Sequence, residues 1–111
     1  MAYTTIDKPT DYFNTVLYTG TGVSRDVTGV GFDPDWVWIK SRSFANNHHA
    51  FDSNRGASKI LRPSTTDAES TLDVMTSFDT DGFTVGETGG NNATNDSGST
   101  FVGWKIGRAH V

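Results

Sequence analysis

Cysteine is absent from the 111-residue chain, and that absence excludes disulfides and thiolate-bound metal sites. Glutamine is also absent, and with only three Leu and two Glu the straight-chain helix formers are scarce. No apolar run approaches the roughly 20 residues of a membrane span. Nine basic residues stand against thirteen acidic ones, and without a basic stripe duplex nucleic acid is excluded as a partner.

What the chain does contain is β-forming and turn-forming residues, with sixteen Thr, twelve Gly, ten Ser and seven Asn. This balance predicts an all-β fold. We expect one compact antiparallel β-sandwich, of the jelly-roll or concanavalin-like kind, with about eight short strands. The expected organisation is a lead-in over 1–11, a single domain over 12–105 and a C-terminal tail over 106–111.

Turn signals divide the chain into eight candidate strands, over 12–18, 23–28, 36–42, 49–52, 58–61, 75–79, 83–86 and 101–104. Segment 23–28 is expected to pair with segment 12–18 across the turn between them. The turn Thr80-Asp81-Gly82 is typical of a hairpin. Thr66 and Glu69 fit a capping box, which would favour one helical turn there.

The strongest strand signal is WVWIKSR at 36–42, where Trp36 and Trp38 share one face and Val37 and Ile39 share the other. Apolar side chains on both faces indicate cover on both sides. We therefore expect Trp36, Trp38 and Trp104 to be structural residues of the core, between the two layers. The alternative is that their flat rings are open to sugar stacking.

Several segments are similar, in shared order and spacing, to repeat modules of tailed-bacteriophage tail fibres and other virion structural proteins. They are MAYTTID at the start, YTGTG at 18–22, GVGFDPDWVWIKSRS at 29–43, FDSNRG at 51–56, TSFDTDGFTVG at 76–86 and GSTFVGW at 98–104. The resemblance covers most of the chain. It implies a lectin-like sandwich with no established reaction, which assembles with other virion subunits as a homo-oligomer and contacts host-surface carbohydrate.

The two ends of the sequence carry separate expectations. Residues 1–9 lack the basic start and apolar stretch of a signal peptide, so we expect production in the host cytoplasm and incorporation into the virion. The hexapeptide IGRAHV at 106–111 is similar to the translation of a common sequencing adapter. We interpret it as foreign to a natural protein that was truncated during environmental sequencing.

Metal and charge-pair candidates come from short acidic motifs. Asp79 and Asp81 alternate as calcium ligands do, although Asp-Gly is also an ordinary hairpin turn. Calcium is the one cofactor that the sequence suggests. Arg55 is placed to pair with Asp52 through a bidentate contact, as a structural clamp or as a ligand contact. His48 and His49 point to opposite faces of a strand, so with Asp52 they make a poor metal or acid–base site.

Two polar loops are the candidate ligand-binding regions, because rigid scaffolds often carry binding groups on loops. With Arg55, the residues able to bond sugar hydroxyls there are Asn46, Asn47, Asn91, Asn92 and Asp96. No nucleophile elbow, phosphate-binding glycine loop or zinc spacing occurs. Asp33 and Asp35 flank Pro34 at a strand entrance with no sign of a cleft, so no catalytic residue is predicted.

These observations leave three functional hypotheses. The first is a non-enzymatic virion module of the tail-fibre kind. The second is a carbohydrate-binding module, and the third is a fragment of a lectin-fold glycoside hydrolase.

Overall fold

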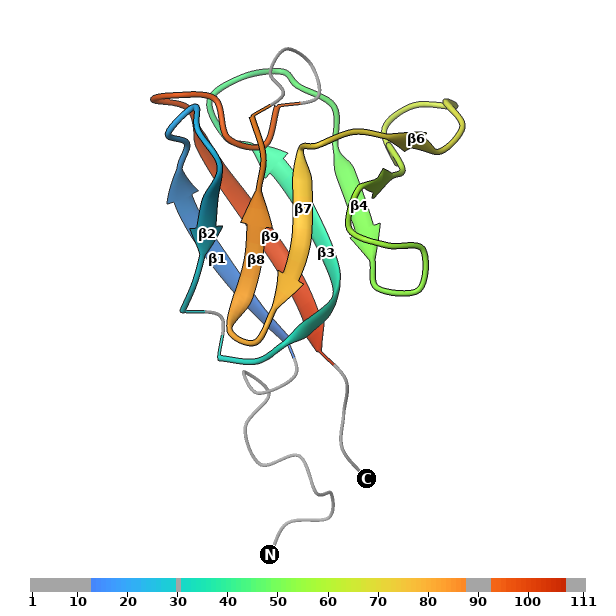
Figure 1. Cartoon of the computed structure of the whole chain (residues 1–111). Coiled ribbons are helices and arrows are strands. Elements are labelled where there is room, and N and C mark those ends of the chain that lie inside the picture. Colours follow the sequence, from blue (N-terminus) through green and yellow to red (C-terminus); the bar gives the residue numbers. More distant parts are fainter. Residues whose placement is uncertain (1–12, 30, 88–92, 108–111) are drawn as a thin grey trace, which may run out of the picture.

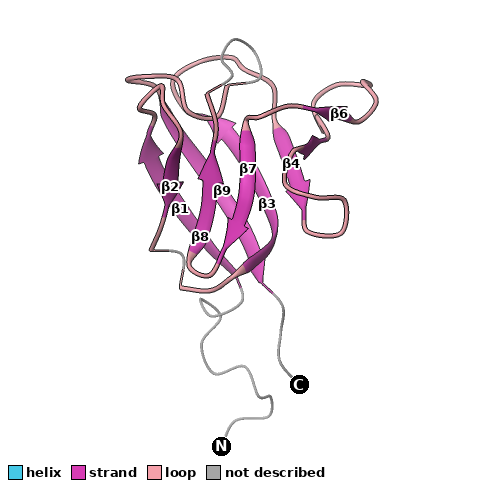
Figure 2. Cartoon of the chain, in the orientation of Figure 1, coloured by secondary structure: helices cyan, strands magenta, loops and turns pink. Residues whose placement is uncertain are grey.

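The computed structural model describes residues 13–29, 31–87 and 93–107, and these contain nine strands and no helix (Figure 2). The strands are β1 (Phe13–Thr19), β2 (Arg25–Val27), β3 (Pro34–Ser41), β4 (His49–Asp52), β5 (Lys59–Ile60), β6 (Ser70–Thr71), β7 (Met75–Asp79), β8 (Gly82–Val85) and β9 (Thr100–Gly107). The all-β prediction is confirmed. Within the described ranges no helix is long and apolar enough to cross a membrane.

All pairings are antiparallel and form two facing sheets with a small hairpin beside them (Figure 1). The four-stranded sheet has the order β1-β9-β3-β4, the three-stranded sheet has the order β2-β8-β7, and β5 pairs with β6. The molecule is a β-sandwich. The predicted turn joins β7 to β8, with Asp79 opposite Gly82.

The expected pairing of the second strand with the first is wrong, because β2 pairs with β8 and β1 pairs with β9. The segment between β1 and β2 crosses from one sheet to the other instead of reversing within one. Gly22 takes a positive φ of 78° there, and its N–H donates to the carbonyl of Asn95 at 2.7 Å.

The expected helical turn at 66–69 is also absent, since these residues have no regular secondary structure. The hydroxyl of Thr65 accepts from the N–H of Asp67 at 3.1 Å, a local turn that competes with helix formation. Glu69 bonds Arg55 and so does not complete the capping box.

The core lies between the two sheets and contains no tryptophan. Val37 and Ile39 of β3 and Phe101 of β9 meet Phe83 and Val85 of β8 there. The expectation of buried tryptophans is therefore wrong for Trp36, Trp38 and Trp104, which are half-buried and lie outside the core cluster. Because side chains alternate along a strand, the β-branched residues of β3 fill the inner face and the indoles take the outer one.

Strand β9 continues to Gly107, so Ile106 and Gly107 lie inside the sheet and not in a separate tail. Ile106 is opposite Phe13 of β1 and Trp36 of β3. The strand thus extends two residues past the domain boundary expected at residue 105. Residues 108–111 lie outside the described residues.

Candidate functional site

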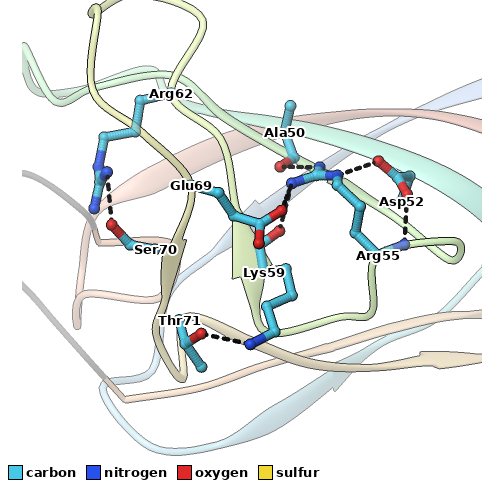
Figure 3. Close-up of polar contacts among 8 residues, drawn as sticks. All are labelled: Ala50, Asp52, Arg55, Lys59, Arg62, Glu69, Ser70 and Thr71. Atoms are coloured by element: carbon cyan, nitrogen blue, oxygen red, sulfur yellow. Dashed lines mark hydrogen bonds and ion pairs between the residues drawn. The ribbon is translucent and has the colours of Figure 1, made fainter.

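Arg55 is the centre of a polar network after β4 (Figure 3). Its Nε donates to Asp52 Oδ2 at 2.6 Å, and its Nη1 donates to Glu69 Oε1 and to the carbonyl of Lys59, both at 3.1 Å. Its Nη2 donates to the carbonyl of Ala50 at 3.3 Å. Four of the five guanidinium N–H groups are thus used within the chain, which fits a structural clamp.

The carboxylate of Asp52 divides its two oxygens between two donors of Arg55. Oδ2 takes the guanidinium, and Oδ1 accepts from the backbone N–H of Arg55 at 2.9 Å. The pair expected from the sequence is present, but it is not the bidentate guanidinium contact. Partial burial raises the pKa of Asp52, yet the hydrogen bonds and charge of Arg55 outweigh it and hold the pKa below its ordinary value.

The same network ties the β5–β6 hairpin to the sandwich. Lys59 Nζ donates to Thr71 Oγ1 at 2.8 Å, and Arg62 Nη1 donates to Ser70 Oγ at 3.3 Å (Figure 3). With Glu69 held by Arg55, the two short strands are fixed by side chains at both ends. We assign this region to the architecture of the domain.

The two carboxylates of the calcium hypothesis have different partners. Asp81 is exposed and accepts from the N–H of Gly31 at 2.7 Å and of Gly29 at 3.0 Å, and these bonds lower its pKa. Asp79 accepts from the hydroxyls of Ser77 and Thr84. Among the described residues no group of three His, Cys, Asp or Glu side chains could hold a metal ion. The geometry gives both carboxylates structural roles around the hairpin.

The two predicted ligand-binding loops lie at the same end of the sandwich, where the N–H of Thr100 donates to Ser43 Oγ at 3.1 Å, whereas Arg55 follows the other end of β4 (Figure 1). Asn46 and Asn47 are half-buried in the loop after β3, and Asp96 is half-buried in the segment before β9. The carbonyl of Asp96 accepts from the N–H of Ser99 at 3.1 Å, which is a turn contact. Asn91 and Asn92 lie outside the described residues.

His48 and His49 point to opposite sides, as alternation predicts. His49 is fully buried on the inner face of β4. His48 is half-buried on the outer side, where its Nδ1 accepts from the indole Nε1–H of Trp38 at 3.0 Å. Asp52 bonds Arg55 instead of a histidine, so the metal or acid–base grouping is not formed.

Asp33 and Asp35 do not make a catalytic pair. Pro34 is the first residue of β3, the strand entrance that the sequence predicts. Asp35 accepts from the backbone N–H of Ser53 at 2.8 Å and from its hydroxyl at 3.1 Å, whereas Asp33 is exposed. The glycoside-hydrolase hypothesis gains no support from this pair.

The feature that sequence reasoning missed is the outer surface of the four-stranded sheet. The side chains of Phe13, Thr15, Leu17, Trp36, Trp38, Lys40, Val102, Trp104 and Ile106 lie there, and we call this set the outer aromatic face. Leu17 is 60% exposed, Phe13 47% and Ile106 44%. Contiguous exposed apolar side chains of this kind mark interaction sites.

The centre of the outer aromatic face is held in place. Trp38 is opposite Trp104 of β9 in the sheet register, and its ring meets Trp36 edge to face, at 5.6 Å between centroids and 67° between planes. His48 Nδ1 accepts from the indole N–H of Trp38 and so holds this ring in place. The alternation in WVWIK at 36–40 places the two tryptophans on the same face of the strand. Because both faces of this strand are apolar, the alternation does not show that the tryptophan face is the outer one.

A second missed feature is Lys105, which lies on the inner face of β9 and is fully buried. Within the described residues no hydrogen-bond partner reaches its Nζ. Burial lowers the pKa of Lys105 to about 8, and attraction to Asp81 opposes that shift only in part. An unpaired buried ammonium destabilises a fold.

A family model matches residues 8–110, nearly the whole chain, and its description is Domain of unknown function (DUF7483). No curated protein and no solved structure shows significant similarity to the chain.

Proposed function

Because the chain belongs to the family DUF7483, which has no assigned activity, we propose its function from its own surfaces and motifs: it is a non-enzymatic structural module of a tailed-phage virion, of the tail-fibre kind. It works by presenting the outer aromatic face to another surface. Its location is the virion surface, and its partners are other virion subunits.

The observation that carries this proposal is the exposure of the outer aromatic face. Large apolar side chains cover three adjacent strands, although the chain has a separate and complete core between its sheets. A surface of this kind serves binding, because solvent exposure of such side chains gives no stability to an isolated domain.

The motifs shared with phage modules support a structural function. FDSNRG at 51–56 contains Asp52 and Arg55, which form the clamp, and TSFDTDGFTVG at 76–86 forms the β7–β8 hairpin. GVGFDPDWVWIKSRS at 29–43 contains β3, the strand that contributes to both the core and the outer aromatic face. These three motifs thus contribute to the scaffold.

The test of the virion assignment is genomic. Recovery of the uninterrupted gene with its neighbours should place it among genes for tail assembly. A position inside a metabolic or polysaccharide-degradation operon, in several independent genomes, would contradict the proposal.

A carbohydrate-binding module is the second candidate, because three half-buried indoles on one face can stack on sugar rings. A glycan array probed with and without a chelator tests it and also tests the calcium hypothesis. Binding that is lost in Trp104→Ala would establish this candidate. The absence of binding to every glycan in both conditions would remove it.

A further inference from the structure

The outer aromatic face forms a regular grid, because the sheet register aligns its side chains in rows across the strands. The middle row contains Thr15, Trp104 and Trp38 from β1, β9 and β3. The row on one side contains Phe13, Ile106 and Trp36, and the row on the other side contains Leu17, Val102 and Lys40.

This grid is complementary to itself under a two-fold axis that runs along the middle row. Such an axis exchanges the two flanking rows between face-to-face copies, as an isologous interface requires. Phe13 then meets Leu17 of the second copy, Ile106 meets Val102, and Trp36 meets Lys40. Phe13, Leu17, Ile106 and Val102 thereby face apolar side chains, and the Lys40 cation faces the aromatic ring of Trp36.

Lys40 is suited to this contact. Its Nζ donates to the carbonyls of Ser41 at 2.7 Å and Phe44 at 3.0 Å, and these two bonds take up two of its three N–H donors within the described part of the chain. The ion pairs within the described ranges do not include it. An ammonium in this state is attracted to the face of an indole.

The ring geometry favours a protein surface over a polysaccharide on this face. Trp36 and Trp38 are at 67° to one another, and Trp38 and His48 are at 84°. Perpendicular rings make a corrugated surface and not a flat platform for a ribbon-like sugar chain. Leu17, Val102 and Ile106 add aliphatic area, which protein interfaces bury well.

The size of the sheet fits a weak dimer. The three strands of the outer aromatic face, about 4.8 Å apart with seven or eight residues at about 3.4 Å each, cover roughly 400 Å² before side-chain relief is counted. This area lies below the standard interface of about 800 Å² per partner, in the range of weak complexes. Two outer faces can pack as aligned sheets do, with strand directions within about 30°.

We propose that the outer aromatic face binds a second copy of this chain, across a two-fold axis along the Trp104–Trp38 row. This inference specifies the partner in the proposed assembly function and rests on it. The gene neighbourhood tests the virion assignment, whereas the experiment below tests only the interface, so the two can fail separately.

The first experiment is sedimentation of the full chain between about 5 and 500 µM, where micromolar dimers dissociate on dilution. We expect a monomer–dimer equilibrium. Leu17→Lys should raise the dimer Kd at least about tenfold, because it places a charge in the apolar contact. Val23→Lys is the matched control, since Val23 is also 60% exposed but lies off the outer aromatic face, and it should leave the Kd unchanged.

The second experiment uses the absence of cysteine to test the axis. Thr15→Cys places a thiol in the middle row, where it meets its own copy, and a short bis-maleimide should link the two chains. Thr76→Cys on β7, which is exposed on the far sheet, should not be linked. A circular dichroism spectrum equal to that of the parent shows that each variant is folded.

Several results would overturn the proposal. A monomer at every concentration is one, and equal linking of Thr15→Cys and Thr76→Cys is another. A monomer whose tryptophan emission is quenched by a glycan would show that the occupant of the face is carbohydrate instead.

Discussion

At the scale of single residues, the chain uses its charges for architecture. Arg55 and Asp52 were recognisable from their spacing in FDSNRG, because a turn of that length brings them together. The contribution of Glu69 was not recognisable, since it comes from a segment fourteen residues further along the chain. A clamp between distant segments depends on the fold, which local patterns do not contain.

We expect Arg55→Lys to lower the free energy of unfolding by about 1–3 kcal/mol, because an ammonium cannot replace the planar fork that bonds Asp52, Glu69 and two carbonyls. Urea denaturation measures this. Arg25→Lys is the control, since Arg25 donates an exposed hydrogen bond to the carbonyl of Thr19 and otherwise only lies over the Tyr18 ring within the described residues. Equal losses in the two variants would argue against a clamp.

The clamp also predicts an acid dependence. The folded-state pKa of Asp52 is depressed, so its stabilising contribution is complete above the ordinary pKa of a carboxyl. It is lost as the pH falls through the lower, folded-state pKa. The difference in unfolding free energy between the parent and Asp52→Asn should therefore shrink below about pH 4.

We expect Lys105→Met to stabilise the protein at pH 7 by about 1–3 kcal/mol, because it removes a buried ammonium with no hydrogen-bond partner among the described residues. The folded-state pKa of Lys105 is about 8, below the ordinary 10.5, so the unfolded chain binds its proton more tightly. The penalty is therefore complete below pH 8 and is relieved as the pH rises towards 10.5.

Thermal unfolding at several pH values checks this prediction. The parent should gain stability between about pH 8 and 10.5, and Lys105→Met should show less of that gain. Lys59→Met is the control, because Lys59 Nζ is exposed and bonded to Thr71. A less stable Lys105→Met at pH 7 would contradict the interpretation.

At the scale of elements, strand positions followed from composition and turn signals, and strand partners did not. The β7–β8 hairpin was predictable, because only two residues, Thr80 and Asp81, join its strands. The pairings of β1 with β9 and of β2 with β8 were not, because the partners are far apart in sequence. The strand that carries Trp36 and Trp38 was located correctly, but the face that points into the core was not. The tryptophans on one face and Val37 and Ile39 on the other are both apolar, so either face could have filled the core.

The segment before β9 is joined through one side chain to the β1–β2 connection and to the residue after β8. Asn95 Nδ2 donates to the carbonyls of Val23 at 2.5 Å and Gly86 at 3.2 Å, and its Oδ1 accepts from the N–H of Thr21 at 2.9 Å. Nearby, the hydroxyl of Tyr18 donates to the carbonyl of Thr94 at 2.7 Å. These bonds close the end of the sandwich where β1 passes to β2.

We expect Asn95→Ala to lower the free energy of unfolding by about 2–4 kcal/mol, because three bonds of a buried amide are lost and two carbonyls lose a donor. Chemical denaturation measures this. Asn54→Ala, at an exposed turn position, should cost less than about 0.5 kcal/mol. A small effect at Asn95 would show that the segment is not needed to close the sandwich.

At the scale of the whole molecule, the two sides of the four-stranded sheet have different functions. The inner side completes the core, and the outer side remains available for contacts. The sequence predicted the class of fold and the number of layers well. It did not predict the outer aromatic face. Where a strand has apolar side chains on both faces, the alternation of residues does not show which face is buried.

We expect the tryptophan emission of dilute protein to be quenched readily by acrylamide, since none of the three indoles lies in the core. On concentration the quenching should fall as the proposed interface covers the rings. In Leu17→Lys it should stay high at every concentration. If acrylamide quenched the emission poorly even in dilute protein, the tryptophans would be buried in the interior, contrary to this prediction.

The first and last described strands are neighbours, with Phe13 directly opposite Ile106. The polypeptide therefore enters and leaves the sandwich at one end, at points only about 5 Å apart. In a longer polypeptide with several such domains in series, each domain would project sideways from the line of linkers, because its two ends are adjacent. The domains would not be joined end to end as in a rod. The same geometry allows the unit to be grafted into a surface loop of a host scaffold without separating the loop's ends.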